Sequence, residues 1–272
     1  MSHKIRHTQN KITSEGMFFF YLIKEILVWP ISLILVLFGK EKIDSLEKPF
    51  KLISDFFKEA KFTQTIIILN FIFYIVSAFL PENILLHLVN SPSNMLSGRL
   101  YSLVTSGFLH ANIGHLLGNC FFIFVFGRAL ERKLKISKVA FIYFGAMIIS
   151  AIFSNLIHFF ILGEDLAGIG ASGALMGLVS AVILLDPFYI TFVFIIPFPI
   201  MFVGWTAIYG DITGLLSPIQ TNIGHFAHLG GFLSISVLMY FLNDTDKNKL
   251  KKGLYINIIS LLLAGIVVLI IL

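Results

Sequence analysis

Charged residues are scarce in this chain of 272 residues: they make up 13% of it, against about 25% in a typical soluble domain. Hydrophobic residues make up 57%, and the mean hydropathy is +0.90. The low polarity excludes a disordered chain, a collagen-like chain and a basic tail that binds nucleic acid. A lone cysteine, Cys120, excludes a disulfide framework within the chain. Composition therefore predicts a polytopic membrane protein.

Apolar stretches long enough to approach the ~30 Å of a bilayer core divide most of the chain. They cover 65–85, 113–127, 139–162, 172–185, 188–208, 225–242 and 254–272. We expect an all-α fold, a membrane helical bundle with a core over 65–242 and one additional C-terminal transmembrane helix over 254–272.

The N-terminal region, residues 1–64, interrupts this pattern. The apolar stretch 17–38 contains Lys24, Glu25 and Pro30. We favour an interfacial or re-entrant helix here; an eighth span is the alternative. The charged segment 40–64 carries apolar residues at helical spacing, which predicts an amphipathic linker on the membrane surface.

Lysine and arginine are absent from two loops, 163–171 and 209–224, and concentrated in two others, 128–138 and 243–253. Basic loops stay on the cytoplasmic side of a membrane. The two basic loops are therefore expected inside and the two loops without Lys or Arg outside. A spanning 17–38 would place the N-terminal basic residues outside, which disfavours that alternative.

Asp, Glu, Lys and Arg are all missing from four predicted spans, 139–162, 172–185, 188–208 and 225–242. The candidate functional residues in the predicted spans are polar but uncharged. They are His115, Asn119, Ser172, His225 and His228. Intramembrane polar groups are costly and usually functional. An ion-coupled transporter normally needs an embedded acid, whereas a hydrolase built on serine and neutral imidazole does not.

Three short segments place such residues at one depth. Segments 172–185, 228–242 and 115–127 contain 14, 15 and 13 residues, which as helices are about 20–22 Å long. Each is predicted to run from outside to inside. Their first residues, a serine and two histidines, are thus expected about 9 Å below the outer boundary, in a water-filled cavity.

Small residues suggest that two of these helices touch. Gly173 and Gly177 follow Ser172, and small residues also flank His228. Such faces let transmembrane backbones approach closely, within reach of a serine–histidine pair. Each feature also has a plain packing interpretation: a glycine-rich helix contact, a core histidine bonded to a carbonyl, or a polar clamp on one helix face.

The motifs taken together resemble the rhomboid family of intramembrane serine proteases. The matching residues are His110-Ala111-Asn112-Ile113-Gly114-His115 followed by Asn119, then Gly170-Ala171-Ser172-Gly173, then Ala227-His228 with Gly231. The resemblance covers about 65–242, and the final span fits the six-plus-one arrangement found in part of that family.

The resemblance implies that Ser172 is the nucleophile and His228 the general base, a dyad without a buried acid. It implies that His115, Asn119 and the Ser172 backbone N–H stabilise the oxyanion. His110, Gly170 and Gly173 would shape the cavity. No metal or cofactor is implied.

The partners implied are transmembrane protein substrates and the lipid bilayer, not nucleic acid. The location implied is a bacterial cell (inner) membrane with the site open to the outer side. The oligomeric state is not specified. Two departures stand out: Gly98 where the family often has tryptophan, and Met176 where it often has an aromatic residue.

Two other functions are weighed against the protease. A silent rhomboid-like protein would bind membrane clients without cleaving them, but both Ser172 and His228 are present. A transporter with a broken helix at 168–173 is conceivable, but embedded acids and inverted repeats are not found in the predicted spans.

Overall fold

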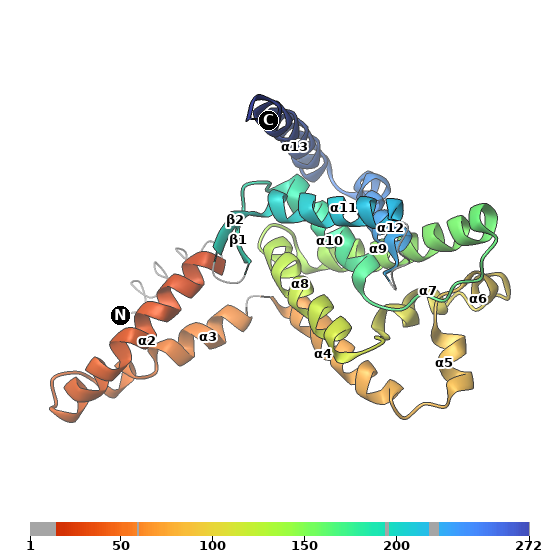
Figure 1. Ribbon diagram of the computed structural model, residues 1–272. Coiled ribbons are helices and arrows are strands. Elements are labelled where there is room, and N and C mark those ends of the chain that lie inside the picture. Colours follow the sequence, from red (N-terminus) through yellow and green to blue (C-terminus); the bar gives the residue numbers. More distant parts are fainter. Residues whose placement is uncertain (1–14, 59, 194–195, 218–222, 272) are drawn as a thin grey trace.

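The computed structural model describes residues 15–58, 60–193, 196–217 and 223–271, and it is mostly helical (Figure 1). The longer helices are α2 (Glu15–Leu37), α3 (Lys48–Lys58), α4 (Lys61–Ser77), α8 (Ile113–Glu131), α9 (Ile136–Leu156), α10 (Ser172–Leu185), α11 (Ile200–Leu216), α12 (His225–Leu238) and α13 (Asp244–Ile271). Short turns of helix fill the connections: η1 (Ile43–Ser45), α5 (Glu82–Leu88), α6 (Pro92–Leu96), α7 (Ser102–Thr105), η2 (Ser106–Phe108), η3 (Ile157–Leu162) and η4 (Met239–Phe241).

The predicted membrane helical bundle is confirmed. Within the described residues, four helical segments are long and apolar enough to cross a membrane: Phe20–Leu37, Ile113–Glu131, Ile136–Leu162 and Asp244–Val267. Four shorter apolar helices accompany them: Lys61–Ser77, Ser172–Leu185, Ile200–Leu216 and His225–Phe241. The segments that begin at Ser172 and His225 are therefore short, as their sequence lengths indicate.

Helix α10 is the centre of the bundle and packs against α8, α9, α12 and α13. It is buried along almost its whole length, as expected for a helix that is apolar on every side. Small residues allow this packing: Gly173 lies against Ser150, and Gly177 lies against Ala146. At Gly231 of α12, any side chain would overlap the Gly173 carbonyl. The start of α10 is thus held in direct backbone contact with α12.

The predicted span 188–208 is wrong. Residues Ile190–Val193 (β1) and Ile196–Pro199 (β2) form an antiparallel hairpin, with Ile190 opposite Pro199. Prolines at 197 and 199 cannot donate helical hydrogen bonds, and the β-branched residues around them favour strands. Helix α11 begins only after the hairpin and continues to Leu216, through part of the expected outer loop 209–224.

The expected cytoplasmic loop 243–253 is also largely helical, because α13 begins at Asp244. Asn257 fixes this helix to the bundle. Its Nδ2 donates to the Ile183 carbonyl at 2.8 Å, and its Oδ1 accepts from Trp205 Nε1 at 2.8 Å. The C-terminal helix is therefore docked on α10 and α11 at its base and projects from the bundle beyond it (Figure 1).

Helices α2 and α3 extend away from the bundle (Figure 1) and pack on each other. Trp29 Nε1 donates to the Leu46 carbonyl at 3.1 Å, which closes the turn between them. Only 6% of the apolar window in α2 is buried. Its interfacial placement stays a prediction, since its length and apolarity also suit a span.

Glu131 joins the end of α8 to the start of α4. Its carboxylate accepts from the backbone N–H groups of Phe62 and Thr63, at 3.1 and 2.7 Å, and from the Thr63 hydroxyl at 2.6 Å. A carboxylate at a helix N-terminus satisfies free N–H groups and complements the helix dipole. Glu131 therefore fixes the end of α8 to the start of α4.

Candidate active site

Ser172 is the first residue of α10, and the loop before it is fixed by backbone bonds. Gly168 and Asn90 exchange two bonds, of 2.7 and 3.1 Å, and the Gly170 N–H donates to the Ser106 carbonyl at 2.9 Å. Gly170 has φ of 120°, a conformation that favours glycine. The backbone that leads into the half-buried serine is therefore held rigidly.

His115 and Asn119 lie one turn apart on α8 and face this backbone. A Cβ added at Gly170 would come within 2.7 Å of the His115 ring and 3.5 Å of Asn119 Nδ2. Within the described residues, the buried Nδ2 of Asn119 has no hydrogen-bond partner. Buried amide donors are rarely left unpaired, because this costs free energy. An unpaired donor beside a serine is what an oxyanion site requires before substrate arrives.

His228 reaches the same region from α12. The Gly173 backbone lies beside the Ala227 carbonyl, so the chain next to Ser172 and the chain next to His228 are neighbours. The imidazoles of His115 and His228 are also near enough for their charges to interact. The structure thus brings Ser172, His228, His115 and Asn119 together at one end of α10.

His110 and Gly98 belong to the segment before α8. His110 is buried, with its ring edge-on to His115 at 5.0 Å between centroids and its Nδ1 3.3 Å from the Phe108 carbonyl. Burial, and secondarily His115, lowers the His110 pKa from 6.5 to about 4, so this ring stays neutral at physiological pH. Gly98 has φ of 81°, and the adjacent Arg99 donates to Asn94 Oδ1 at 3.0 Å. The Arg99 bond thus holds the segment before α8, although Gly98 stands where the family often has tryptophan.

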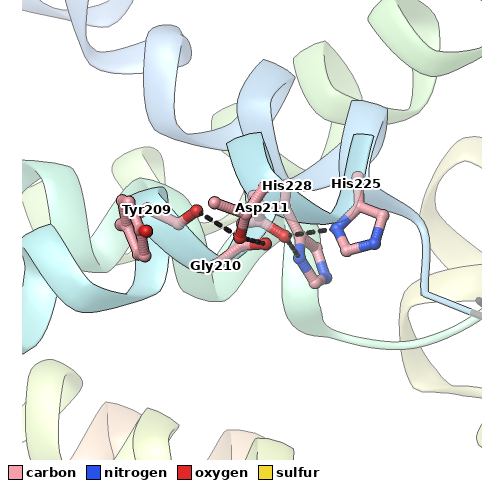
Figure 2. Close-up of polar contacts among 6 residues, drawn as sticks. Tyr209, Gly210, Asp211, His225 and His228 are labelled. Atoms are coloured by element: carbon pink, nitrogen blue, oxygen red, sulfur yellow. Dashed lines mark hydrogen bonds and ion pairs between the residues drawn. The ribbon is translucent and has the colours of Figure 1, made fainter. Parts of the chain in front are cut away.

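An acid that the sequence analysis passed over lies beside His228. Asp211 Oδ1 is 2.8 Å from His228 Nδ1 and 2.8 Å from His225 Nδ1 (Figure 2). Asp211 is only 5% exposed. The structure therefore departs from the expected dyad without a buried acid.

Asp211 escaped prediction because the span was expected to end at 208, which left it in an outer loop. Its helix α11 continues past it, and the next turn contains Gly214, where any side chain would overlap the His225 ring. A usable signal existed in the sequence: a single acid and a glycine at helical spacing, directly after an apolar stretch.

Asp211, His225 and His228 are also the residues that could hold a metal ion. Their ligand atoms lie within 4.8 Å of one another, and no other group of three such residues was found in the described part of the chain. Both imidazoles already bond to the carboxylate through Nδ1. The expectation of no metal stays a prediction.

The fold and this cluster define a polytopic helical membrane protein with a serine, histidine and asparagine gathered in its bundle. The family model described as the Rhomboid domain matches residues 97–244, more than half of the chain. The chain belongs to the rhomboid family, and the predicted resemblance is confirmed.

Curated relatives carry the same family name. RHOMBOID-like protein 12, mitochondrial, of Arabidopsis thaliana is 31% identical over 52% of this chain and 46% of its own length. Putative rhomboid protease YdcA of Bacillus subtilis (strain 168) is 33% identical over 50% of this chain and 66% of its own. Rhomboid-like protease 1 of Toxoplasma gondii is 34% identical over 42% and 40%. The chain spans about half the length of the curated relatives it matches.

Proposed function

We propose that this protein is an intramembrane serine endopeptidase that cleaves transmembrane segments of other membrane proteins near the outer membrane face. The observation that carries the proposal is the convergence at the start of α10: the Ser172 backbone beside the His228 helix, with the unpaired Asn119 amide close by. Membership of a family with relatives named proteases supports the same reaction.

In the proposed reaction, Ser172 Oγ attacks the scissile carbonyl while His228 Nε2 takes its proton. The oxyanion of the tetrahedral intermediate accepts bonds from Asn119 Nδ2, His115 and the Ser172 backbone N–H. His228 then protonates the leaving amine, and an acyl-enzyme remains on Ser172. Water, deprotonated by His228, releases the acyl group and restores the serine.

The proposed reaction requires a substrate whose backbone is extended at the scissile bond. Peptide carbonyls inside a helix are already hydrogen-bonded, so a transmembrane substrate must unwind before Ser172 can reach one. Glycine and proline weaken a helix by roughly 1 and 3 kcal/mol. We therefore infer a preference for single-pass substrates with such residues in the outer third of the span.

The identity of the membrane and the side on which the site opens are also part of the proposal. The Lys and Arg distribution supports a site that opens to the outer side, and a bacterial cell membrane is one setting for it. Curated relatives are named mitochondrial and chloroplastic, and one is from Bacillus subtilis. The compartment is thus part of the proposal.

A catalytically silent client-binding protein is the alternative within the family. A serine-reactive fluorophosphonate separates the two, because it labels only an activated serine. We expect wild-type protein in liposomes to be labelled and to cleave a model single-pass substrate, and the S172A variant to do neither. Binding of the substrate without labelling or cleavage would favour the silent alternative.

A further inference from the structure

We propose that Asp211 is a positioning residue that makes the site a Ser172–His228–Asp211 triad, with His225 as a second support for the carboxylate. This proposal rests on the proposed function and deepens it. The serine–histidine dyad does not explain what orients the His228 imidazole, and the proposal assigns that role to Asp211.

The hydrogen bonds define the tautomer of His228. A carboxylate only accepts hydrogen bonds, so the 2.8 Å contact from His228 Nδ1 to Asp211 Oδ1 requires the proton to be on Nδ1. Nε2 of the neutral ring then carries a lone pair. This is the form that can take the proton of Ser172.

His225 keeps the carboxylate in place. Its Nδ1 lies 2.8 Å from the same Oδ1, and its ring occupies the space that Gly214 leaves open on α11. His225 and His228 are three residues apart on α12, so both rings face α11. Asp211, 5% exposed, therefore has two donors from one rigid helix and cannot turn away from His228.

The pair also has an electrostatic role during the reaction. When His228 Nε2 takes the serine proton, the ring becomes an imidazolium, and the adjacent carboxylate stabilises it without taking the proton. The other titratable groups facing His228 are His225 on its own helix and His115 on α8. Of these three neighbours, Asp211 alone supplies a negative charge.

The test compares D211N with wild-type protein in liposomes. Asparagine keeps the shape but can donate to Nδ1, which favours the wrong tautomer; the corresponding change in a well-known serine protease triad lowers kcat about 10⁴-fold. We expect a kcat loss of 10²-fold or more with little change in KM.

A matched control is D165N. Asp165 is an exposed aspartate in the loop before Ser172, where it accepts from the Ser93 N–H at 2.9 Å. We expect its kcat and KM to match those of wild type. A kcat in D211N equal to that of wild type would overturn the triad. Loss of all activity in S172A in the same assay would show that the protease proposal still holds.

Two further measurements cover misfolding and metal binding. In S172A protein with ¹⁵N-labelled histidine, His228 should show the Nδ1–H tautomer; an Nε2–H tautomer overturns the proposal even if D211N fails to fold. Activity should be unchanged after dialysis against EDTA. Loss that zinc restores would mean that the cluster holds a metal, which also overturns it.

Discussion

At the residue scale, Ser172 and His228 are expected to act as a unit. We predict that S172A and H228A each abolish cleavage and that the double variant is no slower than either single one, because losses within such a unit do not add. Cleavage of a model substrate in liposomes measures this. Additive losses, or strong residual activity in S172A, would contradict the assignment.

Asn119 offers a sharper test, because its proposed role in catalysis and its contribution to stability can be measured separately. Its Nδ2 has no partner in the described residues, so N119A removes a donor without breaking a hydrogen bond to that donor. We predict a kcat about 10²–10³-fold lower, with KM and the thermal midpoint nearly unchanged. Steady-state kinetics and thermal unfolding measure the two effects.

Asn155 provides the matched control for that variant. It is also buried, but its Nδ2 donates to Asn90 Oδ1 at 2.9 Å. N155A should therefore destabilise the protein by about 1–3 kcal/mol. If N119A instead lowers the thermal midpoint as much as N155A, Asn119 braces the helix rather than binding an oxyanion.

At the scale of elements, the contact between α10 and α12 positions the nucleophile against the base. We predict that G231A separates these helices, because its methyl group would overlap the Gly173 carbonyl. Overpacking of this kind costs about 1–3 kcal/mol, and here it should also lower cleavage strongly. Thermal unfolding and cleavage are the measurements.

Gly265 on α13 is the control glycine, because nothing lies within 4 Å of a Cβ added there. G265A should leave cleavage unchanged. Full activity in G231A would show that the spacing of α10 and α12 does not position the serine.

At the scale of the whole molecule, the charge distribution predicts an orientation in the membrane. After Cys120 is replaced, a single cysteine at the exposed position Glu164 should react with a membrane-impermeant thiol reagent from outside. A cysteine at the exposed Lys249 should react only once the membrane is opened. Labelling of position 249 in sealed cells would invert the topology.

The membrane bundle and most of the candidate site could be predicted from the sequence alone. Apolar length predicts the membrane bundle, because a bilayer admits little else. The motifs around Ser172, His228, His115 and Asn119 predict the candidate site, because their order and spacing resemble those of the rhomboid family. Apolar length and motif spacing are both measured within single segments, so the sequence contains them directly.

Only the tertiary structure decided where α11 begins and what faces His228. The hairpin at 190–199 moves the helix along the chain and places Asp211 within it. The bonds from Asp211 to His225 and His228 join residues 14 and 17 positions apart on different helices. Such contacts depend on how α11 and α12 pack, and no periodicity within either segment specifies that packing.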